Sequence, residues 1–171
     1  MGIEAAAALI GGLALWVSPG LSGLGGALFG WLLLALFIFD VEHFWLPNVA
    51  TALLAGTGLV LGEPDWQDRL IGLVGGFVAL ELIRRTYKAI RHREGMGGGD
   101  PKLLAGIGAW LGGAALPFVL LGASLIGLIL VVIRMLRGRP VSGELPLPFG
   151  ALMAAAALMI WIARAQSSLP F

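Results

Sequence analysis

An uncharged run from Ala5 to Phe39 constrains this chain more than any other feature of its sequence. The run is 35 residues long and contains no Asp, Glu, Lys, Arg or His. As one continuous helix it would be about 52 Å long, whereas the hydrocarbon core of a bilayer is about 30 Å thick. Ser18-Pro19-Gly20 is the natural break, because proline and glycine interrupt helices. We therefore expect two membrane helices, near residues 3–18 and 21–39.

The composition agrees with a membrane location. Hydrophobic residues make up 58% of the chain, charged residues only 12%, and the mean hydropathy is +0.94. A soluble domain has about 25% charged residues. A cleavable signal peptide fits poorly, because Glu4 precedes the first apolar run and no Lys or Arg does. The absence of cysteine excludes disulfides, thiolate metal sites and a cysteine nucleophile.

Further apolar runs complete a polytopic helical bundle. A third run follows Pro47 and ends near Leu61, and a fourth covers about 70–83. The uncharged run 103–133 is again too long for one crossing, and we expect its turn around Leu116-Pro117. A last crossing extends from Pro146 to Ala163. The predicted fold class is an all-α integral membrane bundle of about seven helices (six to seven), some short or broken, with residues 1–171 forming a single domain.

The basic residues predict the orientation of this bundle. If the loops after Phe39, Ile83 and Ile133 share one side, that side carries nine of the eleven Lys and Arg residues. Only Arg69 and Arg164 fall on the other side. The positive-inside rule then assigns the basic side to the cytoplasm. Two acids that border apolar segments, Asp40 and Asp100, are expected on that same face.

Asp40 and Asp100 are the candidate functional residues. Asp40 ends the apolar segment "GWLLLALFIFD", and Asp100 follows three glycines, Gly97 to Gly99. Acids at membrane depth favour a functional interpretation. Asp100 followed by Pro101 is also typical of a helix N-cap, which is a purely structural alternative. The glycines favour function, because they allow unusual backbone angles and leave the main chain open to a substrate.

Two neighbouring carboxyls suit acid–base chemistry on a peptide bond. They do not both ionise easily, so one keeps its proton while the other activates a water. That division of roles is the logic of aspartic proteolysis. Spacing alone does not show that Asp40 and Asp100 meet. A small transporter or channel, with the same two acids as proton or cation sites, is the alternative function.

Two ordered motifs add a family resemblance. "FDVEHFWLPN" (39–48) followed by "REGMGGGDPKLLAGIGAWLG" (93–112) resembles the bacterial type IV prepilin peptidases, which are GxGD-class membrane aspartic proteases. "PFGALMA" from Pro148 resembles a further family segment. The residues that match the two motifs are Asp40, Leu46 and Pro47, then Gly97, Gly99, Asp100, Lys102 and Leu103. The resemblance implies that Asp40 and Asp100 are the catalytic pair, with supporting roles for Gly97, Gly99, Lys102, Glu42 and Pro47.

The resemblance also implies a substrate and a location. It predicts an endopeptidase that removes leader peptides from type IV prepilins or type II secretion pseudopilins at the cytoplasmic face of the bacterial inner membrane. No metal or cofactor is expected. The expected partners are these substrates and membrane lipids, and no nucleic acid. Longer family members carry an N-terminal region, often with cysteines, that is linked to N-methylation. Because this chain begins after that region, the resemblance does not extend to methyltransferase activity.

Overall fold

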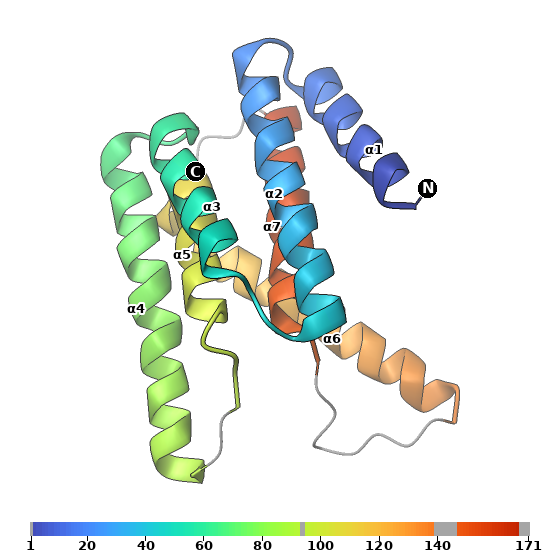
Figure 1. Cartoon of the computed structure of the whole chain (residues 1–171), viewed down its shortest axis with the longest axis vertical. Coiled ribbons are helices and arrows are strands. Elements are labelled where there is room, and N and C mark those ends of the chain that lie inside the picture. The colour runs from blue at the N-terminus through green and yellow to red at the C-terminus, as the bar shows by residue number, and fades with distance from the viewer. Residues whose placement is uncertain (1, 93–94, 139–146, 168–171) are drawn as a thin grey trace.

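The computed structural model describes residues 2–92, 95–138 and 147–167, and these ranges are helical (Figure 1). They contain seven α-helices and one short 3₁₀ helix, η1 (Gly113–Ala115). The α-helices are α1 (Gly2–Val17), α2 (Leu21–His43), α3 (Asn48–Leu61), α4 (Trp66–Arg91), α5 (Asp100–Leu111), α6 (Leu116–Leu136) and α7 (Phe149–Ser167). The predicted all-α membrane bundle is confirmed.

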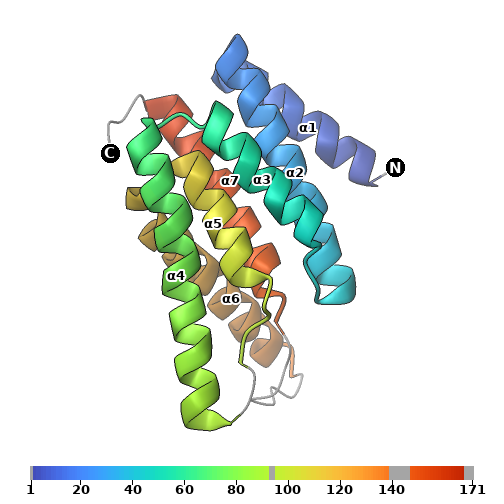
Figure 2. The same ribbon diagram turned by 60° about the vertical axis from the view of Figure 1, so that its left-hand side comes forward.

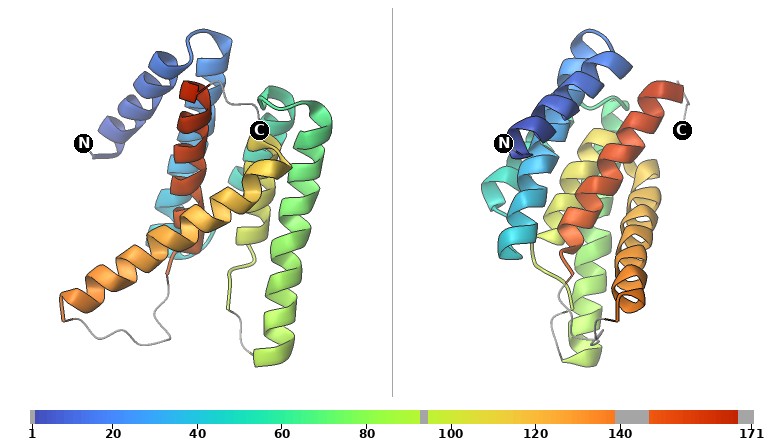
Figure 3. Two further views of the ribbon diagram at one scale, coloured as in Figure 1. Left: turned by 180° about the vertical axis from the view of Figure 1, so that it is seen from behind. Right: turned by 90° about the vertical axis from the view of Figure 1, so that its right-hand side faces the viewer.

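The helices form two groups around α5. Helices α3 and α4 both pack on α5, whereas α2 and α7 lie side by side with α1 against α2 (Figures 1 and 2). Helix α6 runs obliquely across the back of the molecule and packs on α7 (Figure 3). Every residue of α5 except Lys102 is buried. Close packing depends on glycine, because Gly72 of α4 and Gly108 of α5 approach so tightly that a Cβ on either would overlap the other backbone.

The predicted break between the first two helices is confirmed, but α4 extends beyond the predicted run 70–83 at both ends, and the turn after α5 is displaced. The break between α1 and α2 falls at Ser18–Gly20, where Gly20 has a φ of +92°. The turn expected at Leu116-Pro117 begins instead at Gly112, whose φ is +79°. Pro117 lies in the first turn of α6, where its missing N–H has no helical partner to lose. The glycine therefore makes the turn, and the proline starts the next helix.

Within the part of the chain that the structure describes, three helical segments are long and apolar enough to cross a membrane: Leu21–His43, Gly113–Leu136 and Phe149–Gln166. Helices α1 and α3 are shorter apolar helices. Helix α5 has 12 residues, about 18 Å, which is too short to span a bilayer. The expectation that some segments are short is therefore confirmed, and α5 is a core element that other helices surround.

Six helix ends, including those that carry Asp40 and Asp100, lie at one end of the bundle. The C-terminal ends of α2, α4 and α6 and the N-terminal ends of α3, α5 and α7 lie at the same end, which we call the site end (Figure 1). Its described basic residues include Lys88, Arg91, Lys102 and Arg134. Arg93 and Arg139, which belong to the same predicted group, lie outside the described residues.

The opposite end, which we call the far end, holds Arg69 and Arg164, the two basic residues outside the predicted group of nine. Arg69 Nη1 donates to the carbonyl of Leu59, near the C-terminus of α3, at 2.8 Å. Arg164 Nη1 donates to the carbonyl of Leu111, at the C-terminus of α5, at 2.6 Å. Cations are favourable at helix C-termini, where carbonyls lack intrahelical partners. These two arginines therefore have structural roles that account for their exception to the charge distribution.

Candidate active site

Asp40 lies in the last turn of α2 and reaches the beginning of α7. Its side chain is buried, with the residue only 6% exposed. The backbone N–H of Ala151 donates to Asp40 Oδ2 at 2.7 Å. Ala151 is in the first turn of α7, where N–H groups lack helical partners and a carboxylate interacts favourably with the helix dipole. Gly150 permits the approach, because a Cβ there would come 3.0 Å from the same oxygen.

Asp100 begins α5, yet it does not cap the helix. Gly99 occupies the N-cap position. The N–H of Leu103, which a capping side chain would accept from, donates instead to the carbonyl of Gly99 at 2.9 Å. The Asp100 carboxyl turns back over Gly97 and accepts a hydrogen bond from its backbone. The structural alternative of a helix cap is therefore wrong for this residue, which is only 5% exposed.

None of the three glycines before Asp100 has a positive φ. Positive φ occurs at Gly20, Gly112 and Gly138 among the described glycines, and not at Gly97, Gly98 or Gly99. The expectation of unusual angles is wrong. The space beside Gly98 is open, because a Cβ there would meet nothing within 4 Å. Close packing explains Gly99, because a Cβ there would come 2.7 Å from Leu46 Cβ.

The electrostatics of Asp100 show that the two carboxyls lie close enough to interact. Burial, and to a smaller extent the negative charge of Asp40, raise the pKa of Asp100, and the hydrogen bond from the Gly97 backbone lowers it, so that the resulting pKa is about 7. Asp100 therefore holds a proton for much of the time at neutral pH. Two acids that are 60 residues apart in sequence thus form one buried pair at the site end.

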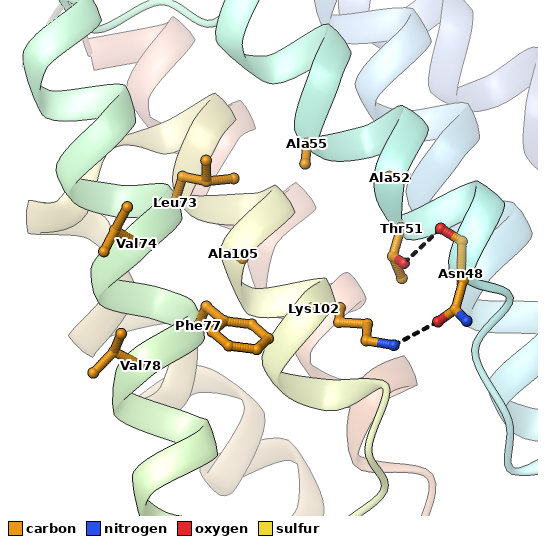
Figure 4. Close-up of a pocket in the computed structure, with 10 residues that line it drawn as sticks. All are labelled: Asn48, Thr51, Ala52, Ala55, Leu73, Val74, Phe77, Val78, Lys102 and Ala105. Atoms are coloured by element: carbon orange, nitrogen blue, oxygen red, sulfur yellow. Dashed lines mark hydrogen bonds between the residues drawn. The ribbon is translucent and has the colours of Figure 1, made fainter.

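The residues predicted to support the pair lie at varying distances from it. Pro47 is the N-cap residue of α3. Glu42 is exposed, and at two residues beyond Asp40 it lies about 200° around the helix from that acid. Lys102 Nζ donates to Asn48 Oδ1 at 2.6 Å, so its ammonium points toward α3 (Figure 4).

Lys102 also borders an open apolar groove that lies between α3 and α4 over α5, with a volume of about 490 Å³ (Figure 4). Lys102, Asn48 and Thr51 supply the polar groups at one end of this groove. Phe77 and Leu73 line its α4 wall. Because Lys102 follows Asp100 by two residues, it lies on nearly the opposite face of α5 from the acid. The groove is therefore separated from the acid pair by the helix itself.

Some residues at the site carry weak sequence signals. Leu46 belongs to a motif, but the motif did not indicate where the Leu46 side chain lies in the fold. Asn48 is signalled only as a polar residue before an apolar run. The donor from Ala151 is a backbone group, which no residue type reveals. Within the described ranges no three His, Asp or Glu side chains gather as a metal site would require.

Comparison with known proteins identifies the family to which this sequence is similar. A profile of the type IV leader peptidase family matches residues 27–132, a range that contains both Asp40 and Asp100. The chain belongs to the type IV leader peptidase family. The matched range contains most of α2, which carries Asp40, and all of α3, α4 and α5, the last of which carries Asp100.

Individual relatives agree with this assignment. The prepilin leader peptidase/N-methyltransferase of Pseudomonas aeruginosa is 40% identical over 167 residues, which cover 94% of this chain and 56% of that protein. The protein of the same name from Aeromonas hydrophila is 38% identical over 156 residues, covering 88% of this chain and 52% of the relative.

The chain spans about half the length of these two relatives. Leader peptidase HopD of Escherichia coli is 38% identical over 138 residues, covering 78% of this chain and 88% of that protein. No solved structure matches the chain significantly.

Proposed function

We propose that this protein is a membrane-embedded aspartic endopeptidase that removes leader peptides from type IV prepilins or type II secretion pseudopilins. The observation that carries the proposal is the buried pair of Asp40 and Asp100 within the range that matches the leader peptidase family. The substrate class rests on the relatives, which are named as prepilin leader peptidases.

In the proposed mechanism the two acids divide the roles. Asp100, whose pKa is raised to about 7, is the protonated partner that polarises the peptide carbonyl and later protonates the leaving amine. Asp40 is the ionised partner, held by the Ala151 N–H, and takes a proton from the attacking water. In this mechanism an extended substrate backbone approaches over Gly98, where a Cβ would meet nothing within 4 Å.

We further propose that the site end faces the cytoplasm in the bacterial inner membrane. The basic residues at the ends of α4 and α6 support this orientation. The chain has no native cysteine, so single cysteines report sidedness cleanly. With Ala89→Cys near the site end and Gln67→Cys near the far end, a membrane-impermeant thiol reagent added outside intact spheroplasts should label only Gln67→Cys. Labelling of Ala89→Cys alone would contradict the orientation.

The decisive test of the function is cleavage by the purified protein in detergent. Incubated with a synthetic prepilin segment that spans the leader junction, the protein should shorten the peptide without any ion gradient. Asp40→Asn serves as the inactive control. An intact peptide after incubation with folded protein would contradict the peptidase function. Proton or cation uptake by proteoliposomes that fail to cleave would favour the ion-site alternative.

A further inference from the structure

Leu46 lies where the acid-bearing segments converge. It belongs to the short connection between α2, which carries Asp40, and α3. Its side chain is 4% exposed although it lies in a loop at the site end. An apolar side chain so completely buried in a four-residue connection is held by elements from elsewhere in the chain.

Two of these elements are the segments that position the carboxyls. On one side, a Cβ added at Gly99 would come 2.7 Å from Leu46 Cβ and 3.1 Å from its Cδ1. On the other side, a Cβ added at Gly150 would come 3.1 Å from Leu46 Cδ1 and 3.0 Å from Asp40 Oδ2. Gly99 directly precedes Asp100, and Gly150 directly precedes the residue that donates to Asp40. Leu46 therefore touches the backbone beside each acid.

We propose that Leu46 is a positioning residue, a spacer whose side chain fixes the separation of Asp40 and Asp100 and keeps bulk water from the pair. This inference rests on the proposed peptidase function and extends it to a residue outside the acid pair. The flanking glycines, Gly99 and Gly150, make the separation of the two acids sensitive to the size of residue 46. Neither glycine carries a side chain that could move to fill or vacate space there.

The alternative is that Leu46 is an ordinary core residue. Leu54 provides the matched control, because it is 0% exposed on α3 and also packs against a glycine of α5. A Cβ at that glycine, Gly106, would come 2.8 Å from Leu54 Cδ2. Leu54 lies nearly two helical turns from the start of α3, so it shares the packing role but not the position beside the carboxyls.

The experiment compares Leu46→Ala, Leu46→Met and Leu54→Ala with the wild-type protein. The ionisation midpoint of Asp100 is measured by infrared spectroscopy of protein labelled with ¹³C-carboxyl aspartate, with Asp100→Asn spectra as the reference. The pH dependence of kcat is measured on the same samples with the synthetic prepilin segment, and thermal melting in detergent reports stability.

Leu46→Ala should admit water beside the pair, lower the Asp100 midpoint by at least one pH unit and reduce kcat at least tenfold. Leu46→Met, which keeps a similar volume, should stay within threefold of wild type with an unchanged midpoint. Leu54→Ala should lower the melting temperature as Leu46→Ala does, yet leave the midpoint unmoved.

An unmoved midpoint in Leu46→Ala, with only a lower melting temperature, would overturn the proposal. If Leu46→Ala fails to fold, Leu46→Val should shift the midpoint in the same direction by a smaller amount, and no shift there would also overturn it. The infrared midpoint does not depend on turnover. A wild-type protein that cleaves nothing would therefore contradict the peptidase function while the spacer role is still tested.

Discussion

The two ends of the bundle use carboxylates in opposite ways. At the far end, each acid accepts from a neutral donor that connects parts of the fold. Asp65 Oδ1 accepts from the Asp68 N–H at 2.8 Å and caps α4, and Asp68 Oδ1 accepts from the Gly113 N–H at 3.0 Å. Glu63 Oε1 accepts from Trp161 Nε1 at 3.1 Å. These acids are exposed or half-buried, so water still solvates their charge.

At the site end, Asp40 and Asp100 are buried, and the charge of one acts against ionisation of the other. Asp40 and Asp100 are 6% and 5% exposed, and the charge of Asp40 acts to keep Asp100 protonated. A buried pair of like groups costs stability, which a structural acid has no reason to incur. The difference teaches that solvation and partners, rather than residue type, separate the two acids proposed to be catalytic from the structural acids of the far end.

The two ends should differ most in how their acids affect the rate of cleavage. Asp40→Asn and Asp100→Asn should each reduce cleavage of a prepilin segment by about 10³-fold or more, because asparagine neither takes a proton from water nor supplies one as an acid. Asp65→Asn at the far end should retain wild-type activity, because asparagine caps a helix about as well as aspartate. Single-turnover rates measure all three. Comparable rates in Asp100→Asn and Asp65→Asn would contradict the assignment.

Stability should respond with opposite signs at the two ends. The folded-state pKa of Asp100, about 7, lies above the ordinary value of 3.8, so the folded protein binds more protons between these values. The stability contributed by protonated Asp100 is then lost as the pH rises through about 7. Asp100→Asn should therefore stabilise the protein at pH 8, by up to about 4 kcal/mol, and have little effect near pH 4.

Thermal melting in detergent at the two pH values checks the sign. A destabilised Asp100→Asn protein at pH 8 would show that the carboxylate contributes favourably to folding, as the far-end acids do.

Removing a far-end acid should cost stability and spare turnover. Asp68→Ala leaves the N–H of Gly113 without its acceptor in the turn between α5 and α6. The expected loss is about 1–3 kcal/mol, with kcat unchanged at temperatures where the protein stays folded. Denaturation curves and initial rates on one preparation separate the two effects. A loss of kcat without a loss of stability would place Asp68 in a functional role instead.

The smallest effect is expected for an acid that lies at the site end without belonging to the pair. Glu42 is exposed and lies on the far side of α2 from Asp40. Glu42→Gln should keep cleavage within about twofold of wild type, as expected for a surface polar change. The same kinetic assay measures it. A tenfold loss would extend the catalytic group beyond the two aspartates.

Charge-free runs and isolated acids made much of this molecule predictable from sequence. The length of the run 5–39 required a break, and proline and glycine marked it correctly. Asp40 and Asp100 stood out because charges beside apolar segments are costly. The turn after α5 was displaced because Gly112 and Pro117 both signal a break, and only the backbone angles decide between them.

The proximity of Asp40 and Asp100 could not be predicted from the sequence. It depends on how α5 packs among its neighbours and on a backbone N–H at Ala151 that every residue type but proline would supply. The close contact of Leu46 with Gly99 is likewise a tertiary feature, because the two residues are distant in sequence.

The most direct test of the account is the titration of Asp100 with and without the charge of Asp40. Infrared spectra of ¹³C-carboxyl aspartate should give a midpoint near pH 7 in the wild-type protein. In Asp40→Asn the midpoint should fall, because the opposing charge is gone, yet stay above 3.8, because Asp100 remains buried. An Asp100 midpoint that is the same in both proteins, or an ordinary one in the wild type, would contradict the claim that the two aspartates form a coupled pair.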